Sequence, residues 1–297
     1  MNEAGYTAEV RETWQGATQF AAGGPDFSNI GTIEAARLAA ERELNIAVVA
    51  RVAANWAGMF VRPGSDYDPE VAGGKEEAFR ALAEDDALIG IGSWGGGDYP
   101  GHQILASDMG LRFAREDSDF NIQTANYGAL GQLVADGDLA AGSTGPVLGA
   151  VDLVRNEEIV PIYYPADYLS ELGFGEMNIN TWVTTQEFVD NNRGAAEALV
   201  QSWYEGTSWL HENALSVVED DQWWGGIGAE SEEGAKWMVR YGLFNEYTLD
   251  SPYIYEEPEL SDEYVEGDQA LLEEAAALGT IPESWADYLT YAQIPQE

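Results

Sequence analysis

The sequence predicts an α/β protein with two lobes. Segments with strand-like and helix-like patterns alternate through two consecutive blocks of the chain, and this alternation is typical of βαβ units. Two further extended segments, 57–65 and 178–185, flank the second block. We expect the chain to cross between the lobes at these two hinge strands. Lobe 1 then comprises residues 1–87 and 179–297, with a helical C-terminal tail, and lobe 2 comprises residues 88–178. A cleft is expected between the two lobes.

The first block consists of three strands and one helix. The alternation of apolar and polar residues from Tyr6 to Trp14 predicts a strand. A short buried strand is expected at 26–31, after which Thr32 would cap a helix over 33–44. The β-branched run at 45–55 predicts a parallel strand covered on both faces.

The second block repeats the same order. The pattern predicts helices at 76–86 and 128–138, strands at 87–94, 119–127 and 159–163, a loop entering a helix over 95–116, and a strand with its loop over 139–150. A longer return strand over 176–192 leads into a helix at 193–213. The remainder of the chain is expected to be mostly helical.

Charge is the strongest compositional feature. The 297 residues contain 53 acidic and 13 basic side chains, for a formal net charge of −40, and no cysteine. The acids are spread along the whole chain, and 45% of the residues are hydrophobic, which argues for a folded protein rather than an acidic tail. Molar salt would screen the resulting self-repulsion. We therefore interpret the composition as that of a halophile's protein, and the absence of basic stripes argues against nucleic-acid binding.

Small polar and glycine residues follow several predicted strands, where ligands bind in open α/β sheets. These candidate ligand contacts lie in four places: Asn29, Gly31 and Thr32; Asn55 and Trp56; Ser93, Trp94, Gly95, Gly97, Asp98, Tyr99 and His102; and Ser143 and Thr144. Tyr127 is added as an aromatic wall, together with Trp56 and Trp94.

The glycine-rich stretch at 92–101 has two interpretations. Its glycines would let a ligand approach the backbone, and the following helix offers free N–H groups. However, it matches neither the Walker nor the dinucleotide pattern, and a flexible surface loop is the simpler alternative. Trp94 and Tyr99 favour a ligand site, because a solvated loop has little reason to carry aromatic residues.

No catalytic or metal motif is evident. The two histidines, His102 and His211, are far apart in the sequence, and no nucleophile elbow is present. Carboxylates are too abundant for any pair of them to be informative. We therefore expect a protein without catalysis, cofactor or bound metal.

The order of these segments resembles the solute-binding proteins of ABC importers, in the branch that includes nitrate, sulfonate, taurine and thiamine-pyrimidine-precursor binders. The similar stretches cover most of residues 6–215 and are "PDFSNIGTIEAARLAAERELNIAVVARV", "LIGIGSWGGGDYPGHQILASDMGL", "ALGQLVADGDLAAGSTGPVLGAV" and "NINTWVTTQEFVDNNRGAAEALVQSWYEGTSWLHEN". The resemblance implies the two-lobed type 2 periplasmic binding protein fold, with a small anion held by hinge closure. It also implies an ABC permease with its ATPase as partners and an extracytoplasmic, cell-surface location.

The chain departs from this family in two respects. It starts almost at the family's second strand, so the first strand is expected to be missing or to lie upstream with a signal peptide and lipid anchor. The proline that follows the family's return strand is replaced by "DNNRGA". Two alternatives stay open: an enzyme of the same fold, similar to pyrimidine-precursor synthases, and a truncated paralogue without a transport role. If the ligand is an anion, Arg11 or Arg51 would supply the positive charge.

Overall fold

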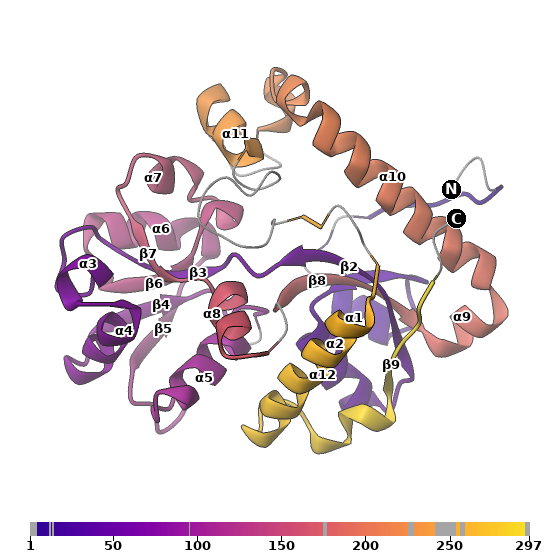
Figure 1. The fold of residues 1–297 in the computed structure, drawn as a ribbon, viewed down its shortest axis with the longest axis horizontal. Helices are drawn as coiled ribbons and strands as arrows, with labels where there is room; N and C mark the ends of the chain where they lie inside the picture. The colour runs from indigo at the N-terminus through magenta and orange to yellow at the C-terminus, as the bar shows by residue number, and fades with distance from the viewer. Residues whose placement is uncertain are drawn as a thin grey trace. The chain divides into compact units, whose positions relative to one another are not determined.

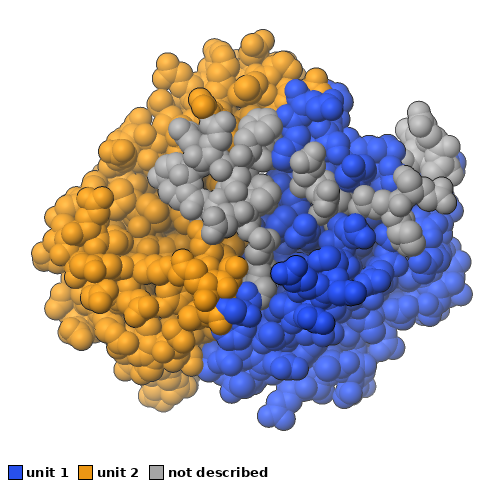
Figure 2. Space-filling model, viewed as in Figure 1, with its two compact units in different colours: residues 1–54, 173–212, 254–297 blue, residues 55–172, 213–253 orange. Residues whose placement is uncertain are grey.

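The computed structural model describes residues 5–294, except 12, 14, 95, 175–176, 225–228, 241–253 and 256–258. It divides into two compact units (Figure 2). Unit 1 consists of residues 1–54, 173–212 and 254–297, and unit 2 consists of residues 55–172 and 213–253.

Unit 1 is built on a four-stranded mixed sheet in the order β1-β8-β2-β9, of which β8, β2 and β9 are labelled in Figure 1. Its strands are β1 (Ser28–Ile30), β2 (Ile46–Ala54), β8 (Asn178–Thr185) and β9 (Leu289–Tyr291). All of β2 is buried except Arg51, as expected from its β-branched and alanine composition. The predicted parallel partner exists only at β9, because β8 runs antiparallel to both β1 and β2.

Short helices and two long ones complete unit 1. They are α1 (Gly16–Ala21), α2 (Thr32–Arg42), α9 (Gln186–Asn191), α12 (Asp262–Ala277), the 3-10 helix η5 (Glu283–Asp287) and α10 (Arg193–Val217), whose last residues belong to unit 2. The Ser261 side chain accepts a hydrogen bond from the Tyr264 N–H and caps α12, and Asp262 and Glu263 follow in its first turn. Both features favour a helix start at this point.

Unit 2 is built on a five-stranded sheet in the order β5-β4-β6-β3-β7. Its strands are β3 (Gly58–Val61), β4 (Leu88–Ile91), β5 (Asn121–Thr124), β6 (Ala141–Thr144) and β7 (Val160–Tyr163). Strands β5 and β6 both run parallel to β4, whereas β3 runs antiparallel to its neighbours β6 and β7. Three parallel strands therefore end at one edge of this sheet.

The connections of unit 2 are mainly helical. They are α3 (Pro69–Ala72), α4 (Lys75–Glu84), α5 (Tyr99–Asp108), α6 (Tyr127–Asp136), η1 (Pro146–Leu148), α7 (Val151–Arg155), α8 (Pro165–Glu171), η2 (Asp221–Trp223) and α11 (Glu232–Met238). The hydrophobic core on the α5 side is rich in aromatic residues: the ring of Phe79 lies 4.8 Å from that of Phe120 and 5.3 Å from that of Tyr163. Such pairs stabilise a core beyond the area that they bury.

The unit boundaries differ from those expected from the sequence. The observed division falls after Ala54 and after Leu172, rather than at residues 88 and 178. Residues 58–61 form β3, which pairs with β6 and β7 and so belongs wholly to unit 2. Residues 178–185 form β8, which pairs with β1 and β2 in unit 1. Strand pairing therefore assigns the two predicted hinge segments to different units.

Two local predictions were wrong. No strand forms in the described residues between Tyr6 and Trp14. Both Tyr6 and Val10 are exposed, so the apolar residues of the alternating pattern do not pack against a sheet. Thr32 does not cap α2: Gly31 occupies the N-cap position, and Thr32 is the first helical residue. Within the described residues, no helix combines the length and apolar character that crossing a bilayer requires.

Candidate ligand-binding loop in unit 2

The candidate site lies at the carboxyl edge of the parallel strands in unit 2. Strand β4 occupies the middle of the order β5-β4-β6, and the chain goes from β4 to β5 on one side before it returns to β6 on the other. The loops after β4 and β6 therefore lead away in opposite directions. Such a topological switch point is where open α/β sheets bind ligands.

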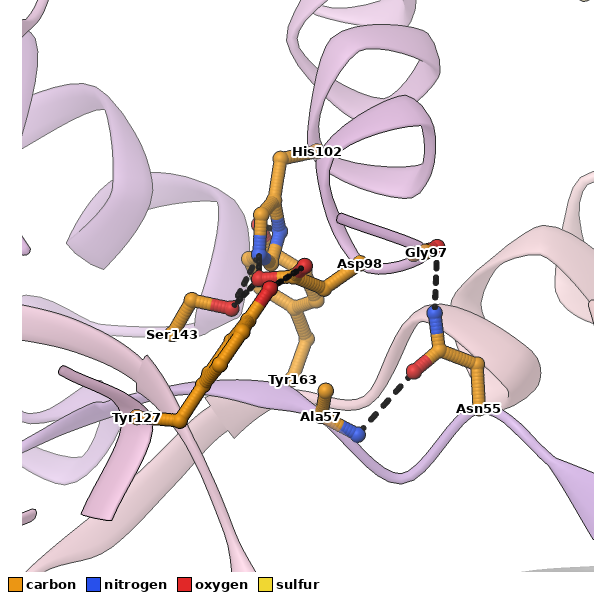
Figure 3. A network of polar contacts seen from close by, with 8 residues as sticks. All are labelled: Asn55, Ala57, Gly97, Asp98, His102, Tyr127, Ser143 and Tyr163. Atoms are coloured by element: carbon orange, nitrogen blue, oxygen red, sulfur yellow. Dashed lines mark hydrogen bonds and ion pairs between the residues drawn. The ribbon is translucent and has the colours of Figure 1, made fainter. Parts of the chain in front are cut away.

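A buried polar network joins the loop after β4 to the end of β6 (Figure 3). The imidazole of His102 lies between the Tyr163 hydroxyl, 2.6 Å from Nδ1, and the Ser143 hydroxyl, 2.9 Å from Nε2. Ser143 donates a short hydrogen bond to Oδ2 of Asp98, and the Tyr127 hydroxyl donates to Oδ1 over 2.7 Å. Asp98, His102 and Ser143 are almost completely buried.

One assignment of hydrogens satisfies every contact in this network. The hydroxyl of Tyr163 donates to Nδ1 of His102, Nε2–H donates to Ser143, and Ser143 donates to Asp98. We assign this tautomer from the hydrogen-bond pattern. Burial lowers the pKa of His102 to about 4, although the charge of Asp98 acts in the opposite direction. Burial, together with Asp98, raises the pKa of Tyr163 well above its ordinary value. The imidazole is therefore neutral at pH 7.

The order of groups differs from that of a nucleophilic triad. In a triad the carboxylate orients the imidazole from the side opposite the serine. Here the carboxylate of Asp98 accepts the hydrogen of Ser143 itself, and a tyrosine occupies the far side of His102. The order of groups is therefore Tyr163, His102, Ser143 and Asp98, which is not the order of that triad.

Asn55 fastens the same loop to the segment that leads into β3. Its Nδ2 donates to the carbonyl of Gly97 over 3.4 Å, and its Oδ1 accepts from the N–H of Ala57 over 3.0 Å (Figure 3). The Asn55 side chain is completely buried. Hydrogen bonds therefore tie Gly97 and Asp98, at the end of this loop, to Asn55 ahead of β3, to Ser143 of β6 and to Tyr127 of α6.

The glycines of this loop make room for Tyr127. A Cβ atom on Gly92 would lie 1.9 Å from Cζ of Tyr127, and one on Gly96 would lie 2.1 Å from its hydroxyl oxygen. The glycines were expected to let a ligand approach the backbone, but at these two positions they admit a side chain of the protein itself. Gly95, another predicted contact, lies outside the described residues.

The aromatic residues of the loop belong to the core. Trp94 and Tyr99 pack edge to face at 5.4 Å between ring centroids, and both are partly buried against the hydrophobic core cluster that includes Phe79 and Phe113. Trp56 is 1% exposed and packs against Tyr164. Their hydrophobic packing explains why this loop carries aromatic residues, so the sequence argument that a solvated loop would not carry them does not by itself indicate a ligand.

Ser143 and Thr144 were expected to act together, but they point to opposite faces of the sheet. Ser143 contacts His102 of α5, whereas the hydroxyl of Thr144 lies 3.6 Å from the place of a Cβ on Gly131 of α6. Successive residues of a strand alternate between faces. Of the predicted contacts, Ser93 is exposed at the start of the loop.

The remaining predicted contacts lie in unit 1. Asn29 is half-buried within β1, opposite Trp182 of β8. A Cβ on Gly31 would lie 3.0 Å from the carbonyl oxygen of Ile179, so the close approach of β8 already accounts for a glycine there. Thr32 is buried at the start of α2, near Asp268.

Asp268 was not found by sequence analysis, because one acid among 53 gives no signal. It is completely buried on α12, and the Tyr291 hydroxyl donates to its Oδ2 over 2.7 Å. Burial raises the pKa of Asp268 to about 6, while the hydrogen bond from Tyr291 and the nearby hydroxyls of Thr32 and Tyr264 act to lower it. Tyr163 of unit 2 was missed in the same way, since its partner His102 is 61 positions away in the chain.

The two arginines considered for anion binding have different surroundings. The guanidinium carbon of Arg51 lies 4.3 Å from the ring centroid of Tyr255 and 5.8 Å from that of Tyr264, a cation–π arrangement within unit 1. Arg11 is exposed and pairs with Glu9. In the part of the chain that the structure describes, no group of three or more potential metal ligands is gathered in one place.

Comparison with known proteins supports the fold. No protein-family model and no curated protein sequence match the chain. Among solved structures, the periplasmic aliphatic sulphonate-binding protein SsuA of Escherichia coli is similar with a TM-score of 0.65 at 9% identity, covering 94% of this chain and 80% of that one. The periplasmic nitrate-binding protein NrtA of Synechocystis has a TM-score of 0.60 at 15% identity, covering 93% and 75%.

A Candida albicans protein with the generic periplasmic binding protein fold has a TM-score of 0.63 at 14% identity, covering 100% of this chain and 90% of that one. Identities this low speak for the fold and not for the ligand. The chain has the α/β periplasmic binding protein fold, as its sequence predicts.

Proposed function

We propose that this protein is a solute-binding protein that captures a small anion and delivers it to an ABC permease and its ATPase outside the cytoplasm. The observation that carries the proposal is the buried network at the switch point of unit 2, which fixes Asp98 at the end of the loop after β4. A preformed loop lowers the entropic cost of ligand binding. The proposal includes no chemical step.

Two similarities support the class of ligand. The Escherichia coli and Synechocystis proteins with this fold are described as binding aliphatic sulphonates and nitrate, respectively. At the same edge of unit 2, the first turn of α6 exposes Asn126, Gly128 and Ala129 beside the loop after β5. The N–H of Gly128 donates to Oδ1 of Asn126 and that of Ala129 to the Asn126 carbonyl, so the positive end of the helix dipole is what would attract an anion here. We further propose that the ligand favours closure of the two units, which the permease recognises.

The first test is thermal unfolding in about 3 M KCl with nitrate, bicarbonate, taurine, short alkanesulfonates, riboflavin and a thiamine pyrimidine. A ligand present at 100 times its Kd should stabilise the fold by about 2.7 kcal/mol. A shift of the midpoint with one class of anion supports the proposal. A cooperative transition that no solute shifts would contradict it and would favour a paralogue without a transport role.

A charge variant locates the site. Ala129→Glu places a carboxylate in the first turn of α6, where it favours the helix but competes with a bound anion. We expect it to abolish the ligand-induced shift without lowering the melting temperature of the free protein. Val71→Glu adds the same charge on exposed α3, which follows β3 at the opposite edge of the sheet, and should leave the shift unchanged.

A further inference from the structure

Three passages of the chain between the two units meet at the end of β2. The chain leaves unit 1 after Ala54, re-enters it at residue 173, and after a second excursion re-enters it at Ile254. Ala54 pairs with Asn178, the first residue of β8, and Ala53 forms an isolated bridge with Ile254. These contacts all lie within unit 1. A side chain that fixes this strand end therefore fixes the places where the chain leaves for unit 2 and returns from it.

Tyr264 of α12 contacts this junction in two ways. Its hydroxyl oxygen accepts a hydrogen bond from Nδ2 of Asn178 over 2.9 Å. The guanidinium carbon of Arg51 lies 5.8 Å from the ring centroid of Tyr264 and 4.3 Å from that of Tyr255. The N–H of Tyr255 in turn donates to the carbonyl of Val52 in β2. Tyr264 is thus linked to β8 directly and, through Arg51, to the segment that returns from unit 2.

Asp268 lies one turn further along α12, near the same hydroxyl group. It is completely buried, and the Tyr291 hydroxyl of β9 donates to its Oδ2 over 2.7 Å. The hydroxyls of Tyr264 and of Thr32, at the start of α2, lie near enough to lower its pKa. Hydroxyl groups of three elements therefore surround this carboxylate.

The charged groups of the neighbouring elements are directed elsewhere. The arginine of β2 lies over the two tyrosine rings described above. Glu34 of α2 interacts with Arg37 of the same helix, and the acids of η5, Glu283 and Asp287, are exposed. Within the described residues, only burial and hydroxyl groups act on the pKa of Asp268. Hydroxyl groups alone therefore compensate its charge.

We propose that Tyr264 and Asp268 form a proton-controlled clasp on the passages between the two units: ionisation of Asp268 tightens the junction at the end of β2, and protonation loosens it. The clasp is built entirely from residues of unit 1. This inference goes beyond the proposed function, because it concerns the connection between the units in the protein without a ligand.

The chemistry of the clasp follows from the hydrogen that the Tyr264 hydroxyl can give. When Asp268 is ionised, this hydroxyl can donate to it while accepting from Asn178, and a hydrogen bond to a charged acceptor is roughly twice as strong as a neutral one. When Asp268 takes up a proton, its carboxyl group must donate instead, and the charge-assisted bond is lost. Burial disfavours the ionised form, but the hydroxyl groups favour it. Ionisation therefore strengthens this contact even though it lowers the stability of the fold.

The distance between the units in the free protein reports on the clasp. The chain contains no cysteine, so spin labels can be attached after Glu187→Cys on α9 of unit 1 and Val71→Cys on α3 of unit 2, two exposed positions. Pulsed electron spin resonance in about 2 M KCl, where surface charges are screened, measures the distances between the labels. We expect a narrow distribution of distances while Asp268 is ionised and a broader one as the pH falls through about 6.

Three variants separate the parts of the clasp. Tyr264→Phe keeps the ring beside Arg51 and removes the hydroxyl, so its distribution should be broad at every pH. Asp268→Asn cannot ionise, so the width of its distribution should not depend on pH. Tyr291→Phe removes a donor that favours the ionised carboxylate but leaves the Asn178–Tyr264 bond in place. It should keep the narrow distribution and move the midpoint of the broadening to higher pH.

Tyr67→Phe is the matched control. It removes a tyrosine–aspartate hydrogen bond, to Asp85, at the surface of unit 2, and should keep the pH response of the wild type. A wild-type width that does not depend on pH, an unchanged distribution in Tyr264→Phe, or a pH response that survives in Asp268→Asn would overturn the inference. None of these measurements needs a ligand, so each of those outcomes would leave the proposed function standing.

Discussion

Burial gives two ionisable residues opposite responses to pH. His102 in unit 2 has a folded-state pKa of about 4, below the ordinary value of 6.5, because burial disfavours its charged form. The same effect raises the pKa of Asp268 in unit 1 from 3.8 to about 6. His102 therefore stabilises the fold fully above pH 6.5 and loses this stabilisation as the pH falls toward 4. Asp268 stabilises the fold fully below about pH 4 and loses this stabilisation as the pH rises through 6.

Asp268→Asn should consequently become more stable relative to the wild type as the pH rises from 4 to 7. Two pKa units correspond to a change of about 3 kcal/mol in the difference between the two free energies of unfolding. Chemical denaturation of both proteins at several pH values measures this difference directly. His102→Gln is the opposite case, and its stability relative to the wild type should rise as the pH falls over the same interval. Parallel curves for either variant and the wild type would refute the assignment.

At the scale of elements, the loop between β4 and α5 takes its shape from α6. The ring of Tyr127, at the first residue of α6, occupies the space where Gly92 and Gly96 lack side chains. Its hydroxyl then reaches Asp98 at the start of α5. The glycines, the aromatic ring and the carboxylate thus form one packing unit at the carboxyl ends of β4 and β5.

Gly92→Ala should therefore destabilise unit 2 by about 1–3 kcal/mol, because the new methyl group overlaps the ring of Tyr127. In a Tyr127→Ala background the same substitution should cost much less, and a double-mutant cycle of unfolding free energies measures the coupling. Gly206→Ala is the control: on exposed α10 a Cβ would meet nothing within 4 Å, so it should stabilise by about 0.5–1 kcal/mol. Additive effects of Gly92→Ala and Tyr127→Ala would contradict this packing.

Local patterns predicted most elements, but they did not predict which elements meet. The helices α2 and α6 and the strand β2 form close to the predicted places. Each helix buries one face, which gives a helical spacing of apolar residues, whereas β2 is buried on both faces and is apolar throughout except at Arg51. The pairing of β2 with β8, more than a hundred residues away, has no local signature. The candidate site shows the same limit, since Asp98, His102 and Ser143 stood out among loop residues, whereas Tyr163 did not.

At the scale of the whole molecule, the strong excess of acidic residues opposes folding through self-repulsion. A formal net charge of −40 on 297 residues repels itself in dilute buffer. The ion pairs of the described residues are mostly exposed, as in Arg11–Glu9 and Arg193–Glu197, and such pairs stabilise proteins weakly. Dissolved salt can screen this repulsion, as the composition predicts for a halophile's protein.

Stability should rise steeply with salt. We expect the melting temperature to increase by about 10 °C between roughly 0.1 M and 2 M KCl, as the Debye length falls from about 10 Å to below 3 Å. Replacing the exposed acids Glu41, Asp138 and Glu273 with their amides should shift this rise to lower salt, because less repulsion remains to be screened. Amide substitution of the buried Asp268 also removes one charge, but it should not move this rise to lower salt, because dissolved ions do not reach a buried side chain. A melting temperature that does not respond to KCl would show that the acidic surface does not limit the stability of the fold.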